Sequence, residues 1–453
     1  MTSDSLLQLN GLIHAATYSL EEIRKHVDFF IKHIGPHLGP GPLGKDGYQP
    51  RYPSAMTDDL TPFELSLCWK DPKQQGRPIV RFVSDIIPAD AERTRIASLL
   101  QSQRLIEALR NIAEDTSDLT LHMLPDIWKA VSHTLKVSET LIHSGSCSQC
   151  GSSSAFIAFD LKKSVISGKF YWRLPFCLDV PGTLNLMDHV FSACFAVHEF
   201  FGSAVFSTSW HQIREHIRNH ADTLLPRMIS IDATAFPAPR IKVYVNCRFQ
   251  GERNFDSWEH HLRFNDSVAS PEDFRSTCRD LWNSLTTNPP EWAQTRPDAG
   301  PKSCLLLYEL TASSAKTTDE QRQKLSSKLY IMCQEIPLPD SVIATQLLRH
   351  CELAGDADTL NPTHMSLTKD ETMPRPRVRI RYDDQSRLCS VHEPMLCYFR
   401  WGLSPDYGTP YLSLNRALCM AIMEQPQQQS QRRERMECGL NGYTRTMTSE
   451  NAT

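Results

Sequence analysis

Three strings of this sequence alternate cationic or tyrosine side chains with apolar ones. They are Lys169-Phe170-Tyr171, Arg240-Ile241-Lys242-Val243-Tyr244 and Lys328-Leu329-Tyr330. Because successive side chains of a strand point to opposite faces, each string places its cations and its tyrosine on one face. Such a face can bind an anion such as a diphosphate at one level and stabilise a carbocation against tyrosine rings at the next. The strings therefore predict a polar site lined by strands.

The predicted anion site depends on five cations in the second strands of four expected hairpins. They are Arg81, Lys169, Arg240, Lys242 and Lys328. The only carboxylates expected on the same face are Glu64 and at most Asp85, so the face should carry unbalanced positive charge. Converging Lys and Arg donors can neutralise a diphosphate leaving group, as magnesium does in other enzymes. For any single strand, the solvated face of an amphipathic sheet is the alternative.

Tyrosines and one glutamate are expected beside these cations. The tyrosines are Tyr171, Tyr244, Tyr330 and Tyr411. The negative faces of their rings could shield an allylic cation from water, although ordinary packing is the alternative for one strand tyrosine. The register of Glu64 also points it inward, where a carboxylate can accept the proton of an indole N–H or a phenol O–H. A surface glutamate on a solvated strand is the other interpretation.

No metal site is predicted. The sequence lacks the D-D-x-x-D cluster of other isoprenoid enzymes, since Asp58-Asp59 and Asp383-Asp384 stand alone. Cys147 and Cys150 form a C-x-x-C pair without the second pair of a zinc site. The pair His260-His261 is discounted because adjacent residues on a helix are expected to point apart. We therefore expect a reaction with no cofactor and no obligatory metal.

Strand-like runs come in pairs separated by helical patterns. The expected hairpins join 61–70 with 78–85, 155–160 with 166–174, 228–234 with 239–248, 303–311 with 326–335, and 395–401 with 410–415. The expected helices lie near 17–33, 92–113, 121–143, 185–201, 208–222, 270–284 and 340–354. Ten antiparallel strands that close on themselves leave no exposed edge, and helices would cover the outside. The polar faces of the strands would then line a lumen.

Composition restricts the kind of protein further. With 453 residues, 40% of them hydrophobic, and no good linker, we expect one domain over residues 1–420 and a disordered tail over 421–453. A net charge of -4 argues against nucleic acid as a partner and favours small molecules. The most apolar run, 189–206, is interrupted by polar residues, so no membrane span is expected. Fourteen cysteines without framework spacing indicate a reduced, cytoplasmic setting.

At these residues the chain resembles the fungal dimethylallyltryptophan synthase family of aromatic prenyltransferases. The resemblance runs from about residue 50 to residue 416. It is carried by the strings that begin at Thr57, Val80, Lys169, Arg240, Asn254 and Thr409. It implies an α+β fold, the ααββ (ABBA) prenyltransferase barrel, in which ten antiparallel strands line a lumen and helices lie outside.

The resemblance also implies roles for the site residues. Glu64 takes the family's general-base position, and the four tyrosines shield or hydrogen-bond the donor. Arg81, Lys169, Arg240 and Lys242 take diphosphate positions. Lys328 stands where a glutamine is common, which adds a charge near the diphosphate, and Asn415 stands where a late tyrosine is usual.

The implied activity is metal-independent transfer of a dimethylallyl group from dimethylallyl diphosphate to an aromatic acceptor in fungal secondary metabolism. The acceptor would be an indole or tryptophan derivative or a polyketide phenol. One alternative is acceptor-free cyclisation of a longer allylic diphosphate, and another is non-catalytic binding of an anionic aromatic ligand. The sequence does not choose the acceptor or the donor length, and it leaves a homodimer open.

Overall fold

The computed structural model describes residues 9–10, 13, 16, 18–38, 54, 56, 62–68, 79–86, 94–115, 120–142, 150–151, 153–162, 165–232, 239–248, 255–263, 279–280, 282–284, 303–311, 324–332, 381–382, 388–390, 398–402 and 413–415. The expected helix at 340–354, most of the one at 270–284 and the tail 421–453 lie outside these residues. Within them, no helix is both long and apolar enough to cross a membrane.

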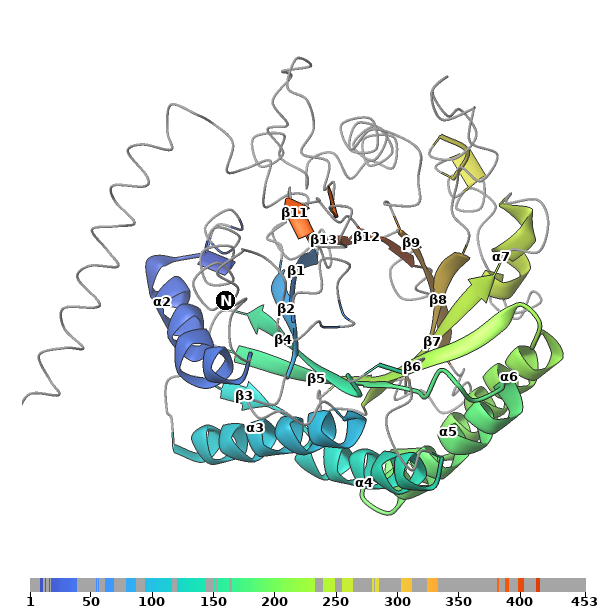
Figure 1. Ribbon diagram of the computed structural model, residues 1–453, viewed down its shortest axis with the longest axis horizontal. Coiled ribbons are helices and arrows are strands. Elements are labelled where there is room, and N and C mark those ends of the chain that lie inside the picture. Colours follow the sequence, from blue (N-terminus) through green and yellow to red (C-terminus); the bar gives the residue numbers. More distant parts are fainter. Residues whose placement is uncertain are drawn as a thin grey trace, which may run out of the picture.

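Five antiparallel hairpins form the centre of the fold, as the sequence predicted. Their strands are β1 (Phe63–Cys68) with β2 (Ile79–Asp85), β4 (Ala155–Lys162) with β5 (Val165–Arg173), β6 (Leu224–Asp232) with β7 (Arg240–Arg248), β8 (Ser303–Thr311) with β9 (Lys324–Met332), and β12 (Tyr398–Gly402) with β13 (Ser413–Asn415). Each hairpin also pairs antiparallel with the next one, through β2–β4, β5–β6, β7–β8, β9–β12 and β13–β1. The pairings return to the first strand, which makes a ten-stranded ring (Figure 1).

A short extra strand was not expected. Strand β3 (Thr120–His122) pairs in parallel with residues 165–167 of β5. The β5–β6 pairing begins only at Lys169, so β3 covers the edge of β5 that β6 leaves open. The helix expected from residue 121 therefore begins later, as α4 (Pro125–Ile142), with proline at its first position. The other pair of strands, β10 (Arg381–Tyr382) and β11 (Leu388–Ser390), forms a separate two-stranded sheet.

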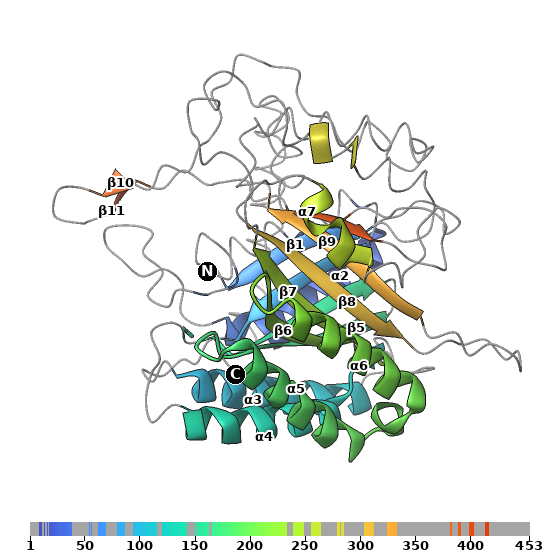
Figure 2. The same ribbon diagram turned by 90° about the vertical axis from the view of Figure 1, so that its right-hand side faces the viewer.

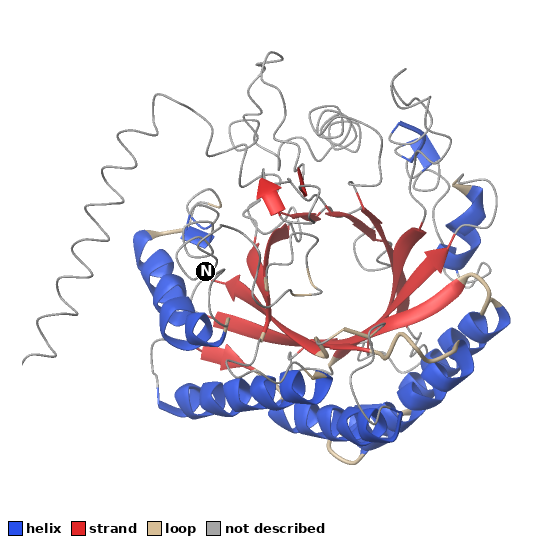
Figure 3. Ribbon diagram, in the orientation of Figure 1, coloured by secondary structure: helices blue, strands red, loops and turns tan. Residues whose placement is uncertain are grey.

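Helices lie on the outside of the ring (Figures 2 and 3). They are α2 (Leu20–Phe29), followed by a π-helical turn η1 (Phe30–Ile34) and a 3-10 turn η2 (Gly35–His37), then α3 (Arg95–Asp115), α4, α5 (Val180–Phe195), a 3-10 turn η4 (Glu199–Gly202), α6 (Ala204–Asn219) and α7 (Asp256–Arg263). Helix α5 begins five residues before its expected start because Asp179 caps it by accepting from the Gly182 N–H.

Two separate groups of buried side chains show which way each strand faces. The large group packs the outer face of the strands against the helices and includes Phe82, Phe170 and Val243. The smaller group contains Phe156, Ala158, Tyr171, Tyr244 and Leu307. Its members alternate along the strands with members of the large group, so they face the interior of the ring. The predicted inward face of the strands is therefore confirmed.

Candidate active site

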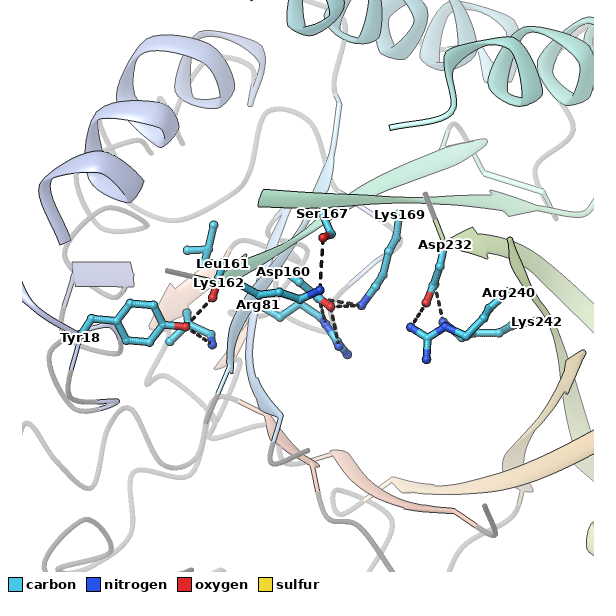
Figure 4. Close-up of polar contacts among 11 residues, drawn as sticks. Tyr18, Arg81, Asp160, Leu161, Lys162, Ser167, Lys169, Asp232, Arg240 and Lys242 are labelled. Carbon is cyan, nitrogen blue, oxygen red and sulfur yellow. Dashed lines mark hydrogen bonds and ion pairs between the residues drawn. The ribbon is translucent and has the colours of Figure 1, made fainter. Parts of the chain in front are cut away.

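A buried carboxylate joins two of the predicted cations inside the ring. Arg81 on β2 lies directly across from Asp160 on β4, and its Nε donates to Asp160 Oδ1 at 2.5 Å. Lys169 on β5 reaches the same carboxylate, with its Nζ 2.6 Å from each oxygen. All three side chains are nearly inaccessible to solvent. Figure 4 shows them extending from neighbouring strands toward one point in the ring.

A second carboxylate joins the other pair of described cations. Asp232 on β6 accepts hydrogen bonds from Arg240 and from Lys242, both on β7. Asp232 also lies across from Lys169 of β5 in the strand register, which sets the two groups side by side (Figure 4). Arg240 also contacts β8, the other neighbour of β7, where its guanidinium nitrogen is 3.8 Å from a carboxylate oxygen of Glu309. The described cations thus form two adjacent ion-paired groups, one around Asp160 and one around Asp232, which together make up the ion-pair network.

The expectation that Glu64 and at most Asp85 are the only carboxylates on the inward face was wrong. Among the described side chains of the two ion-paired groups, four cations contact three carboxylates, namely Asp160, Asp232 and Glu309. These acids lie on the first strands of the three middle hairpins, β4, β6 and β8, where no inward carboxylate was expected. The antiparallel register brings each one beside cations of the neighbouring strands. The result is a pre-arranged network with a small net positive charge.

Asp85 points inward like Arg81 but takes no part in this network. Its carboxylate accepts hydrogen bonds from the hydroxyls of Ser54 and Ser153. Burial raises the pKa of Asp85, although the two hydroxyls and nearby Arg173 oppose that effect. Asp85 is therefore part of a separate polar group near the end of β2.

Burial and neighbouring charges shift the pKa values of two groups in the network. Burial raises the pKa of Asp232, but Arg240, Lys242 and Lys169 outweigh it and hold that pKa well below its usual value. Burial and the charge of Arg81 lower the pKa of Lys169 well below its usual value, against the opposing effect of Asp160 and Asp232. Neighbouring cations thus favour the charged form of Asp232, whereas burial and Arg81 disfavour the charged form of Lys169.

Three of the four predicted tyrosines lie in a row next to the network. The Tyr171 and Tyr244 ring centroids are 6.1 Å apart, and those of Tyr244 and Tyr330 are 6.0 Å apart. Tyr171 and Tyr244 are buried in the inner apolar group, and Tyr330 packs against it. Tyr171 and Tyr244 each follow a lysine of the same strand by two residues, a distance of about 7 Å along the strand. Tyr411 lies outside the described residues.

Glu64 lies on the same side of the strands as the cations. It pairs with Val83, Val83 pairs with Ala158, and Ala158 pairs with Lys169. Cross-strand partners point to the same face, so Glu64 faces the interior, where it is half-buried. The backbone of Lys328 pairs with Leu307 and with Gly402, but its side chain lies outside the described part.

Polar and aromatic side chains on one inward face, inside a ring of five hairpins wrapped by helices, define a prenyltransferase barrel. The family described as tryptophan dimethylallyltransferase matches residues 3–362, and the chain belongs to it. A curated relative is 4-O-dimethylallyl-L-tyrosine synthase of Claviceps purpurea (strain 20.1), which is 25% identical over 71% of this chain and 74% of its own. The protein is accordingly an aromatic prenyltransferase.

Solved structures share the fold at low sequence identity. AnaPT from Neosartorya fischeri superposes with a TM-score of 0.63 at 16% identity, over 91% of this chain and 91% of its own. NotF, solved in complex with brevianamide F and DMSPP, superposes with a TM-score of 0.59 at 15% identity, over 90% of this chain and 91% of its own. The predicted α+β, ααββ barrel is therefore confirmed.

Proposed function

We propose that this enzyme transfers a dimethylallyl group from dimethylallyl diphosphate to an aromatic acceptor without an obligatory metal. The observation that carries the proposal is the step from cation to tyrosine along two strands, Lys169 to Tyr171 and Lys242 to Tyr244. A two-residue step of about 7 Å separates the levels at which a diphosphate and the allyl group bound to it would sit.

The ion-pair network would bind and release the diphosphate. Arg81, Lys169, Arg240 and Lys242 offer charge-assisted hydrogen bonds to its oxygens, and they stabilise the charge that grows on the leaving group as the C–O bond breaks. Asp160 and Asp232 hold the cationic ends in place before the donor arrives. Donors that are fixed in advance do not have to reorganise during the reaction.

The tyrosine row would then receive the allyl cation. The faces of Tyr171, Tyr244 and Tyr330 attract a cation, and the apolar residues around them keep water away from it. An aromatic acceptor attacks the cation and loses a proton, which Glu64 takes as general base. In this scheme one C–O bond of the donor breaks, one bond to the acceptor forms, and diphosphate leaves.

The acceptor is proposed as a free aromatic amino acid or a related phenol or indole. Two names support this proposal. The Claviceps purpurea relative is named as a 4-O-dimethylallyl-L-tyrosine synthase, and the family is named as tryptophan dimethylallyltransferase. A role in secondary metabolism is part of the same proposal.

Mixing dimethylallyl diphosphate with a panel of acceptors tests the proposal. The panel should hold L-tyrosine, L-tryptophan, an indole diketopiperazine and a polyketide phenol, with mass spectrometry to detect a dimethylallyl adduct. A donor-only reaction detects cyclisation or hydrolysis, and geranyl diphosphate tests the donor length. Adduct formation with any member supports the proposal. Tight donor binding without turnover on any acceptor would instead support a binding protein.

A further inference from the structure

Three histidines meet on the outside of the barrel, away from the ion-pair network. His216 is near the end of α6, His220 follows that helix immediately, and His261 belongs to α7. One ring nitrogen from each lies within 4.8 Å of the other two. None of them takes part in the proposed binding of the donor.

Their orientations suit a shared ligand. His216 and His220 are four residues apart, which places them on one side of the helix end. The Nδ1 of His220 is 2.8 Å from the His216 carbonyl oxygen, so this nitrogen donates and Nε2 is left to accept or to bind a metal. The Nδ1 of His261 is 3.2 Å from the Nε2 of His216. Two nitrogens bound to one tetrahedral zinc ion are about 3.3 Å apart, given Zn–N distances of about 2.0 Å.

Two of these rings are buried in the outer layer of the fold. His261 is 1% and His216 is 5% exposed. Burial lowers the pKa of His216 to about 4 and that of His261 to about 2, with neighbouring histidines adding to the effect. The Tyr308 hydroxyl of β8 donates to the His261 carbonyl and fixes the backbone at that residue. His216 and His261 are therefore buried side chains held in place by the surrounding structure.

The pair His260-His261 was not expected to bind a metal, because adjacent residues on a helix should point apart. The two rings in fact lie with centroids 3.7 Å apart. In addition, His216 of α6 and His220 just after it lie close to His261 and complete a group of three histidines. His220 lies 41 residues before His261 in the sequence, and the packing of the helices brings their rings together. The sequence alone therefore gave no indication that these histidines meet.

We propose that His216, His220 and His261 bind one divalent transition-metal ion, with zinc the best match. Three imidazoles and a water complete a tetrahedral shell of the kind that zinc accepts, whereas magnesium requires oxygen ligands. The ion would fasten α7, a helix of only eight residues, to the end of α6. A helix this short has little stability of its own, so the cross-link would stabilise the outer layer and take no part in prenyl transfer.

The test uses the full chain without a histidine tag. After treatment with a chelator and its removal, the protein is titrated with zinc sulfate, and bound zinc is counted by elemental analysis. Cobalt(II) is added separately as a spectroscopic probe, because a tetrahedral site gives intense visible absorption. We expect about one zinc per chain, and a rise in Tm of about 3 °C at a zinc concentration ~100 times the Kd.

Two variants make the test specific. His220→Ala removes the least buried ligand and should abolish stoichiometric zinc, the cobalt absorption and the zinc-dependent rise in Tm. His211→Ala removes an exposed histidine of the same helix and should leave all three unchanged. If His220→Ala fails to fold, His220→Gln replaces it. Zinc binding that is absent from the wild type, or equal in the wild type and the His220 variant, would overturn the proposal.

Discussion

Replacement of Lys242 by methionine separates a diphosphate contact from a structural ion pair. Lys242 is 3% exposed, and its ammonium donates to Asp232. A hydrogen bond to a charged group is worth about 1.5–3 kcal/mol. Because each 1.36 kcal/mol is a factor of ten in rate, kcat/KM for the donor should fall by about 10- to 150-fold.

The same variant should also destabilise the protein, for a different reason. Asp232 is completely buried and keeps Arg240 as its partner when Lys242 is lost. Leaving a buried charge wholly uncompensated costs about 3–5 kcal/mol, so a partial loss should cost less than that. Adding Asp232→Asn removes the excess negative charge. The double variant should therefore regain Tm while its donor kcat/KM stays low.

The assay is diphosphate release at saturating acceptor over a range of donor concentrations, with Tm measured by calorimetry. Lys129→Met is the matched control, because Lys129 is exposed on α4 outside the barrel. It should leave both quantities unchanged. Recovery of kcat/KM in the Lys242→Met, Asp232→Asn double variant would refute the reasoning, since Lys242 would then serve only to balance Asp232.

Three further predictions concern the base, a proton and metal. Glu64→Gln should lower turnover by about 100-fold or more with donor KM nearly unchanged, and wild-type turnover with both a phenol and an indole would remove Glu64 from the mechanism. The pKa of Lys169 lies well below 10.5 in the free protein, and a bound diphosphate should raise it. At pH values between the pKa of Lys169 in the free protein and its pKa in the complex, binding of inorganic diphosphate should take up protons, and its affinity should weaken as pH rises. Calorimetry in buffers of different ionisation enthalpy measures the number of protons taken up. No proton uptake at any pH would contradict the prediction. Activity should survive excess EDTA with at most a modest loss, assayed well below Tm, and a complete loss restored by magnesium would point to an aspartate-bound metal instead.

Most of the barrel could be predicted because its strands carry strong period-two patterns. In Arg240-Ile241-Lys242-Val243-Tyr244 the alternation fixes both the strand and its inward face, and the structure agrees. Strand β3 escaped prediction because three residues carry no readable period, and it is held in place by pairing with the edge of β5. The start of α5 was missed because the capping contact of Asp179 precedes the apolar pattern of the helix.

The site was predicted in part for a similar reason. Repeated Lys-x-Tyr strings made the cations and tyrosines visible, and the structure brings Lys169, Lys242, Tyr171 and Tyr244 together. Their roles remain predictions. The acids were missed because Asp160 and Asp232 are each a single carboxylate near the end of a largely apolar strand. The alternation from Phe156 through Ala158 to Asp160 was the available clue to an inward carboxylate.

The stoichiometry of a single reaction tests the central claim most directly. Dimethylallyl diphosphate and a competent acceptor are mixed with the metal-free enzyme, and both released diphosphate and prenylated acceptor are quantified over time. We predict one diphosphate per prenylated acceptor and almost no release without acceptor. Equal diphosphate release with and without acceptor, or release that exceeds the prenylated product, would contradict transfer within a shielded barrel.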